Sequence, residues 1–250
     1  MPAISVVIPA YNAQNTIKET IQSVLNQTFS DFEIIVINDG STDETLNIVQ
    51  TISDPRLKVF SYANAGPSIS RNRGISNASG EFIAPLDSDD IWLPDKLEAQ
   101  LNALRDYPQA AIAYSWIDHI NEQGNFLRKG TRNTDTGNVY AKLLLVNFIV
   151  TTSNPLIRRT ALTEVGEFNP NLKWADDRDM WIRLAARHEF VCVPAVHILY
   201  RQSSYSLSAN IIRQCNGSIT VLKTAFDSAP TELQYLRAYS YSNIAVLNQL

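Results

Sequence analysis

Four short apolar runs alternate with helix-like segments over residues 4–86, and this alternation limits the folds open to the chain. The runs cover residues 4–8, 33–37, 57–61 and 81–86. Nearly continuous apolar runs of this length are typical of strands buried on both faces of a parallel sheet. A repeated strand, helix, strand order predicts an open, mostly parallel α/β sheet flanked by helices, with its site at the carboxyl ends of the strands.

The pattern is less regular beyond residue 90. We expect further elements over residues 94–106 (helix), 110–116 (strand), 121–125 (hairpin turn), 174–184 (helix) and 191–200 (one or two strands). From Ile211 onward the pattern is mainly helical, with Pro230 separating two segments. The sequence therefore predicts a main domain over residues 1–205 and a helical C-terminal extension over residues 206–250.

Composition excludes several classes of protein. The 250 residues are 45% hydrophobic and 18% charged, with a formal net charge of -4 and no Lys/Arg run, so a phosphate-neutralising nucleic-acid surface is not expected. Only Cys192 and Cys215 occur, which supports neither a disulfide framework nor a cysteine-rich zinc site. No transmembrane or signal-length apolar segment is present, so we expect a cytoplasmic protein, with association at the inner face of the membrane left open.

An acidic cluster follows the fourth apolar run. Asp87, Asp89 and Asp90 place three carboxylates within four residues at the end of an expected strand. Carboxylates this close repel one another unless a cation or hydrogen-bond donors compensate, so a hard divalent metal ion, Mg²⁺ or Mn²⁺, is one explanation. The other is a solvated helix start without a ligand.

Candidate caps occur at two expected helix starts. Ser41 and Glu44 have capping-box spacing before the second expected helix. Asp90 or Asp95 is the candidate N-cap of the helix that Pro94 opens.

Other acids also stand where an α/β sheet places its ligands. Asp39 follows the second expected strand, and Asp176 and Asp177 open a later helix. The dinucleotide, P-loop, zincin and nucleophile-elbow motifs are absent from the sequence.

Five pieces of sequence, in order, resemble family-2 glycosyltransferases with the GT-A fold. They are Pro9-Ala10-Tyr11-Asn12, Asn38 to Asp43, Gly66-Pro67-Ser68 with Arg71-Asn72 and Gly74, Gly80 to Asp90, and Asp176-Asp177 with Asp179 to Leu184. Each piece is weak alone, because D-x-D occurs widely, but their shared order is specific. The resemblance covers roughly residues 3 to 205.

The resemblance implies transfer of a sugar from a nucleotide-diphosphate donor (UDP, GDP or dTDP) to an acceptor hydroxyl, with inversion at the anomeric carbon. On the donor side Asp39 matches the family's base-binding aspartate, which would accept a hydrogen bond from a ring N–H. The wall formed by Pro9, Ala10 and Tyr11 would face the base.

The same resemblance assigns the chemistry. Asp87, Ser88 and Asp89 match the D-x-D motif, in which the first acid contacts the ribose or the metal ion and the second binds the metal ion. Asp177 matches the general base that removes the acceptor proton. Arg71 is a candidate donor contact, with a solvated helix-face arginine as the alternative.

Some positions depart from the family pattern or leave the function open. Asp176 stands where Glu is common and Ser203 where His is common, which puts the roles of both positions in doubt. We expect Arg73 to be solvated, Trp174 and Trp181 to border the acceptor site or fill the core, and the three histidines to be structural or at the surface. The acceptor is expected to be a glycan or a lipid-linked saccharide.

Two other functions use the same acids. A glycoside hydrolase also needs paired carboxylates, although it has no use for a base-binding Asp39. A non-catalytic module that binds a sugar nucleotide or glycan would keep the acids without turnover.

Overall fold

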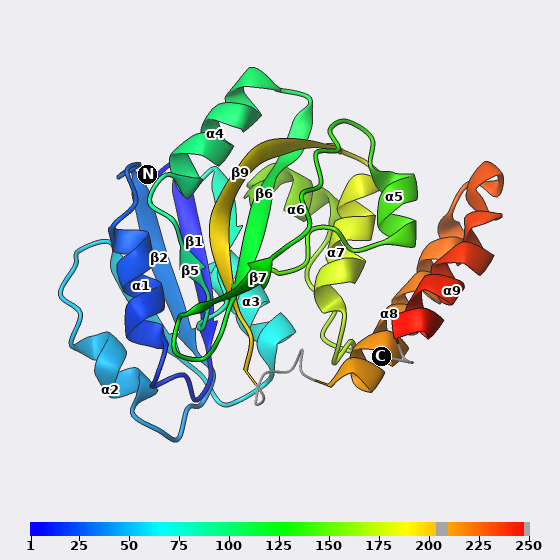
Figure 1. Ribbon diagram of the computed structural model, residues 1–250. Coiled ribbons are helices and arrows are strands. Elements are labelled where there is room, and N and C mark those ends of the chain that lie inside the picture. The colour runs from blue at the N-terminus through cyan, green and yellow to red at the C-terminus, as the bar shows by residue number, and fades with distance from the viewer. Residues whose placement is uncertain (204–209, 248–250) are drawn as a thin grey trace.

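The computed structural model describes residues 1–203 and 210–247, with side chains described as far as Ile244. One sheet runs through the molecule in the order β3-β2-β1-β4-β8-β6-β9-β5, and β7 pairs with β6 (Figure 1). Helices cover both of its faces, which confirms the expected α/β class.

The first half of the sheet is parallel, as the alternation predicts. It consists of β1 (Ile4–Ala10), β2 (Phe32–Asn38), β3 (Leu57–Ser61) and β4 (Phe82–Pro85). Neighbouring residues of β1 point to opposite faces, so Val6 and Ile8 join one core cluster and Val7 joins the other. Both faces of this strand are therefore buried, which explains its continuous apolar run.

Three helices connect these strands and lie on different faces. They are α1 (Ile17–Leu25), α2 (Thr45–Gln50) and α3 (Pro67–Ser76). Helix α1 packs Ile17, Ile21 and Val24 into the core cluster that contains Val6, whereas α3 packs on the side of Val7. The crossovers place the loops that follow β1, β2 and β4 together at one edge of the sheet.

The second half of the sheet is mixed. Its elements are β5 (Ile91–Trp92), α4 (Lys96–Asp106), β6 (Ala110–Ile120), β7 (Phe126–Lys129), α5 (Tyr140–Leu145), β8 (Leu156–Arg158), α6 (Arg159–Val165), α7 (Asp176–Ala185) and β9 (Glu189–Arg201). Strand β8 runs antiparallel to both β4 and β6, while β9 pairs in parallel with β6. Register shifts between β6 and β9 accommodate the curl of this long pair.

The C-terminal helices pack against the rest of the chain. Helix α8 (Ile211–Ser228), the short 3₁₀ helix η2 (Thr231–Leu233) and α9 (Leu236–Leu247) lie beside α7 and α5 (Figure 1). Phe226 of α8 and Trp181 of α7 belong to the same buried cluster. At Gly217 a Cβ atom would come within 2.8 Å of the Trp174 carbonyl oxygen, so α8 closely approaches the turn before α7. The expected domain boundary at residue 205 lies outside the described residues.

The expected capping box at α2 is wrong. Glu44 occupies the N-cap position without a side-chain capping bond, and the Ser41 hydroxyl instead accepts a hydrogen bond from the Asn12 amide at 3.1 Å. Asp43 accepts from the Thr45 amide at 3.0 Å and satisfies the helix start. Ser41 therefore bonds to the loop that follows β1 and does not cap α2.

Candidate active site

The loops after β1 and β2 bring the proposed base-binding residues to one edge of the sheet. Pro9 and Ala10 end β1, and Tyr11 follows with 52% of its surface exposed. The Asp39 amide donates to the Ala10 carbonyl at 2.8 Å, which joins the two strand ends. Tyr11 is therefore open to a ligand, whereas Ala10 contributes backbone.

Asp39 lies just after β2 and is almost completely buried. It is 3% exposed, and its carboxylate accepts from the amides of Ala65 and Gly66 at 3.0 and 2.8 Å. Arg73 donates to the same carboxylate at 3.2 Å and lies 4.4 Å from the centre of the Tyr62 ring. The expectation that Arg73 is simply solvated is wrong, because this residue of the last turn of α3 forms an ion pair with Asp39.

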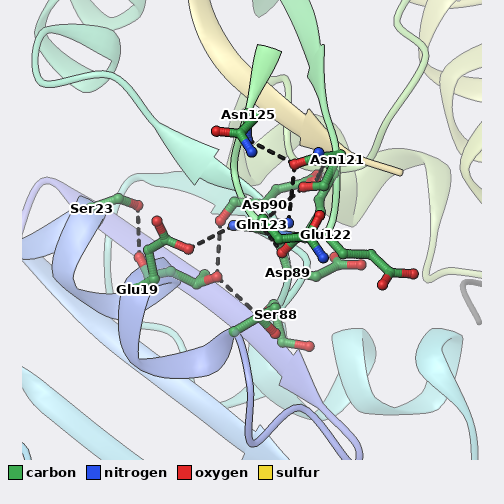
Figure 2. A network of polar contacts seen from close by, with 12 residues as sticks. Glu19, Ser23, Ser88, Asp89, Asp90, Asn121, Glu122, Gln123 and Asn125 are labelled. Carbon is green, nitrogen blue, oxygen red and sulfur yellow. Dashed lines mark hydrogen bonds and ion pairs between the residues drawn. The ribbon is translucent and has the colours of Figure 1, made fainter. Parts of the chain in front are cut away.

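The acidic loop after β4 is held by α1 on one side. The hydroxyls of Thr16 and Thr20 donate to the Ser88 carbonyl at 2.9 and 3.0 Å, and Thr20 also reaches the Asp90 carbonyl at 2.9 Å. Figure 2 shows Asp89 and Asp90 between Glu19 of α1 and the hairpin residues Asn121 and Glu122. The backbone of the acidic loop is thus fixed by neighbouring elements.

Asp90 anchors this loop and is not a helix cap. Its carboxylate accepts from the Arg201 amide at 2.9 Å, the Ser153 hydroxyl at 2.5 Å and the Thr151 hydroxyl at 3.2 Å. Asp95 occupies the N-cap position of α4 without a side-chain capping bond. Asp90 therefore supports the loop through β9 and the segment before β8, rather than through α4.

Arg201, at the end of β9, joins three parts of the chain. It is 3% exposed, and its Nε donates to the Asp89 carbonyl at 2.8 Å. One terminal nitrogen donates to the Glu122 carbonyl at 2.8 Å and the other pairs with Glu19 at 2.6 Å. This one guanidinium therefore ties the acidic loop to the hairpin and to α1.

The acidic loop concentrates negative charge that a cation would neutralise. Burial, together with the charge of Asp87, raises the pKa of Asp89 to about 6. Burial and both neighbouring acids also raise the pKa of Asp90. No group of three or more His, Cys, Asp or Glu side chains able to hold a metal ion occurs among the described residues. Asp87 and Asp89 fit an ion only if substrate oxygens complete its coordination.

Arg71 connects the acidic loop to the start of α7. It is 6% exposed, and its two terminal nitrogens pair with Asp87 at 2.8 Å and Asp176 at 2.7 Å. The Ser68 hydroxyl also donates to Asp176 at 2.8 Å. The solvated alternative for Arg71 is wrong, and Asp176 lies against α3 as the partner of this arginine.

Asp177 has a different environment from its neighbour. Asn147 donates through its side-chain amide to the Asp177 carboxylate at 3.1 Å. Burial, followed by the charge of Asp176, raises the pKa of Asp177 to about 6, whereas Asn147 and the charge of Arg71 act in the opposite direction. The carboxyl group can therefore take up or release a proton close to neutral pH.

The segment 147–154 contributes site residues that the sequence patterns did not indicate. Besides Asn147, it supplies Thr151 and Ser153, and the Ser153 hydroxyl also accepts from the Asp87 amide at 3.0 Å. In the sequence, small polar residues of this kind are typical of an ordinary loop. Their burial in the structure shows that they belong to the site: Ser153 is fully buried and Thr151 is 4% exposed.

Several other expectations concern residues near the site. Trp181 is fully buried in the core, and Trp174 lies half-buried near Arg213. His119 and His197 are buried and His188 lies 3.2 Å from Glu164, which agrees with structural roles. The Ser203 hydroxyl donates to Glu122 at 2.9 Å, so this residue packs toward the hairpin.

Two solved structures share the fold of this chain. TarS 1-349 of S. aureus, solved in complex with UDP-GlcNAc, superposes with a TM-score of 0.78 over 98% of this chain and 72% of that one, at 19% identity. The mannosyltransferase PcManGT from Pyrobaculum calidifontis, solved with GDP-Man and Mn²⁺, has a TM-score of 0.70 over 98% and 74% of the chains, at 18% identity. The chain has the GT-A fold of these glycosyltransferases.

Sequence comparison identifies the family. The model described as "Glycosyltransferase like family 2" matches residues 5–250, and the chain belongs to that family. An uncharacterized glycosyltransferase of Rickettsia bellii (strain RML369-C) is 36% identical over 187 residues, which are 74% of this chain and 26% of that protein. Chondroitin synthase of Pasteurella multocida (strain Pm70) is 32% identical over 194 residues, or 76% and 20% of the two chains.

The chain therefore spans only about a quarter or less of the length of these two relatives. Over residues 1–203 and 210–247, no helix has the length and apolar character needed to cross a membrane.

Proposed function

We propose that this chain transfers a sugar from a nucleotide-diphosphate donor to an acceptor hydroxyl, with inversion at the anomeric carbon. The observation that carries the proposal is the meeting of two separate acidic groups through Arg71, which pairs with Asp87 after β4 and with Asp176 beside Asp177. In this proposal the group at Asp87 would lie beside the donor diphosphate, and Asp177 would provide the proton acceptor. The family match favours transfer over hydrolysis or binding without turnover.

The donor would bind across the ends of β1, β2 and β4. Asp39 would accept a hydrogen bond from the ring N–H of uracil, thymine or guanine, with Pro9, Ala10 and the exposed Tyr11 along the other side of the base. The carboxylate already accepts hydrogen bonds from two backbone amides and from Arg73. A remaining lone pair must therefore meet the ligand, or the turn at Ala65 and Gly66 must shift.

Asp89, with Asp87, would hold Mg²⁺ or Mn²⁺, and Asp87 with Ser88 would also lie at the ribose. The ion would supply positive charge to the leaving diphosphate. Support comes from the crowding of the acids in this loop and from the Mn²⁺ in the mannosyltransferase structure. Two carboxylates leave most coordination positions for phosphate oxygens and water.

Asp177 would act as the general base in a single displacement. The acceptor oxygen bonds to the anomeric carbon while its proton passes to Asp177, and the bond from that carbon to the diphosphate breaks with its electrons leaving on the nucleotide. A carboxyl with a pKa of about 6 is ionised at neutral pH yet basic enough to assist this transfer.

The acceptor is proposed to be a glycan or lipid-linked saccharide. Support comes from the likeness to proteins named chondroitin synthase and hyaluronan synthase. We propose a cytoplasmic location or the inner face of a membrane for this reaction, since nucleotide sugars are the donors.

Two variants test the division of roles. Asp89→Ala should weaken Mn²⁺-dependent binding of UDP or GDP, measured by calorimetry, because it removes the proposed metal ligand. Asp177→Asn should lower release of nucleotide from a panel of UDP-, GDP- and dTDP-sugars with saccharide acceptors by about a hundredfold or more, with nucleotide affinity unchanged.

The opposite pattern would contradict the assignment. Unchanged Mn²⁺-dependent affinity in Asp89→Ala would remove this residue from the metal site. Equal loss of affinity and turnover in Asp177→Asn would indicate a structural role for Asp177.

A further inference from the structure

Among the residues that the structure describes, the side-chain amide of Asn147 donates a hydrogen bond to the Asp177 carboxylate from outside α7. The distance from its Nδ2 to Asp177 Oδ2 is 3.1 Å. Asn147 comes from the segment between α5 and β8, so this contact joins two parts of the chain that lie 30 residues apart. A donor aimed at one carboxylate oxygen restricts rotation of the carboxyl group.

The position of Asn147 is itself held by a strained turn. Its Oδ1 accepts from the Val150 amide at 3.4 Å, and Val150 has a φ of 72°, a left-handed conformation that is unfavourable for a β-branched residue. Such strain persists only where the surroundings impose it. The constraint comes from the following residues, because Thr151 and Ser153 are anchored on Asp90.

Strained backbone is concentrated around this site. The non-glycine residues with positive φ in the described chain are Asn12, Val150 and Ala175. Asn12 follows β1, and Ala175, at a φ of 59°, directly precedes α7 and Asp177. Left-handed turns thus flank both partners of the hydrogen bond between Asn147 and Asp177.

We propose that Asn147 is a positioning residue that orients the Asp177 carboxyl, and that segment 147–154 links this orientation to the acidic loop through Asp90. The proposal rests on the proposed function of Asp177 as the base. The same short segment contacts Asp177 at its start and Asp90 further along. Segment 147–154 therefore connects Asp177 to Asp90 of the acidic loop. Arg71 makes a second connection, between Asp176 and Asp87.

The charged groups that face Asp177 determine what loss of Asn147 should do. Burial and the charge of Asp176 raise the pKa of Asp177, whereas a backbone hydrogen bond from Arg178, the charge of Arg71 and the amide of Asn147 lower it. Arg178 follows Asp177 on α7, and its own pKa responds to that carboxylate. Asn147→Ala leaves the three charged groups in place and removes the side-chain amide that donates to Asp177 and accepts from Val150, so the pKa of Asp177 should rise by about one unit.

The first experiment measures turnover against pH. Asn147→Ala should lower kcat by about ten- to a hundredfold and shift the acid limb of the kcat profile upward, with Mn²⁺-dependent UDP or GDP affinity unchanged. Asn147→Gln, which keeps the amide donor, should recover part of the loss. Asn47→Ala is the matched control, because Asn47 also donates its amide to a carboxylate, Glu44 at 2.8 Å, on exposed α2.

The second experiment repeats the substitution without the base. In an Asp177→Asn background, Asn147→Ala should cause no further loss of turnover, since a residue acting through Asp177 has nothing left to orient. An additional tenfold loss in that background, or a parallel loss of nucleotide affinity, would overturn the proposal and make Asn147 a residue that only maintains the loop.

The third experiment separates this proposal from the proposed function. Carboxyl ¹³C NMR can follow titration of Asp177 with or without turnover, using Asp177→Asn to assign the signal. A higher pKa in Asn147→Ala supports the orienting bond even if no donor sugar is turned over, which would contradict only the transferase proposal. An unchanged pKa would overturn the role of Asn147, whatever the activity of the wild type.

Discussion

Asp176 and Asp177 are adjacent in sequence and have the same side chain, yet their surroundings give them different properties. Asp176 accepts hydrogen bonds from both Ser68 and Arg71, and the contact with Arg71 is an ion pair. Asp177 accepts a backbone hydrogen bond from Arg178 and one from the side-chain amide of Asn147, and burial raises its pKa to about 6. The two donors hold the Asp176 carboxylate in place, which suits a structural role, whereas the raised pKa of Asp177 suits proton transfer.

This difference predicts the pH dependence of turnover. Because the pKa of Asp177 is raised and the ionised form is the proposed base, kcat should fall about tenfold per pH unit below about pH 6 and level off above it. The measurement is kcat at saturating donor and Mn²⁺ across about pH 4.5–8. An acid limb near pH 4, the ordinary range of an aspartate, would contradict the role of burial at this carboxyl.

At the residue scale, the sequence motifs indicated which acids to examine but not how they are connected. Asp39, Asp87, Asp89 and Asp177 could be chosen because they end strands or begin a helix in the family's order. The partners of these acids, Asn147 for Asp177 and Ser153 for Asp90, could not be chosen from the sequence. The segment that carries them reaches the acids only because β8 lies between β4 and β6.

Among the elements, β2 combines an apolar run with one buried acid. Glu33 is 4% exposed, and its carboxylate accepts from Ser5, Ser79 and Lys58, each at 2.7 Å. Although burial alone acts in the opposite direction, these donors together lower the pKa of Glu33 to about 2. This carboxylate therefore joins β2 to β1, to β3 and to the turn before β4.

Glu33→Gln should lower the free energy of unfolding by about 1.5–3 kcal/mol at pH 7, because it removes a charged acceptor from those three side-chain donors and from the Ser79 amide, which donates at 2.8 Å. Since the folded pKa lies below the usual value, the stabilisation is present above about pH 4.5 and is lost as the pH falls toward 2. The difference in free energy of unfolding between the wild type and Glu33→Gln should therefore be smaller in urea titrations near pH 3 than at pH 7.

The control for this measurement is Glu81→Gln, at a side chain that is 71% exposed and 3.8 Å from Arg158. We expect its effect to be within about 0.5 kcal/mol at either pH. If the two variants lost equal stability at pH 7, the buried network around Glu33 would not contribute as argued.

Element boundaries followed the sequence closely where the chain alternates. The strand expected over residues 57–61 was confirmed without a shift, and β2 extended the expected run by one residue at each end. Beyond residue 90 the expectations were less complete. A two-residue strand such as β5 has too few residues for a periodic pattern, and its pairing with β9 depends on tertiary contact.

For the whole molecule, the C-terminal helices share their core with the helix that carries Asp177. Phe226 is 1% exposed and belongs to the cluster that contains Met180 and Trp181 of α7. Helix α8 also approaches Trp174 closely through Gly217. We therefore expect α8 and α9 to unfold together with the sheet, although the sequence pattern sets them apart as an extension.

Phe226→Ala should lower the stability of the whole described chain by about 3–5 kcal/mol, because it leaves a cavity against α7. Urea unfolding followed by tryptophan fluorescence and by far-UV circular dichroism should give coincident transitions in the wild type and in the variant. Ile212→Ala, at a residue 67% exposed on α8, should change stability by less than about 0.5 kcal/mol. A separate early transition in the wild type would show that the helices unfold independently.

The sequence by itself determined the alternation of buried strands and helices, the parallel half of the sheet and the family, because these depend on local periodicity and on short motifs in order. Only the tertiary structure decided how the acids are paired. Burial, strand order and side-chain direction set whether a carboxylate pairs with an arginine side chain, as Asp87 and Asp176 do, or accepts only amide groups, as Asp177 does. Those contacts join residues far apart in the chain, and their electrostatic consequences depend on exclusion of water, which local sequence does not specify.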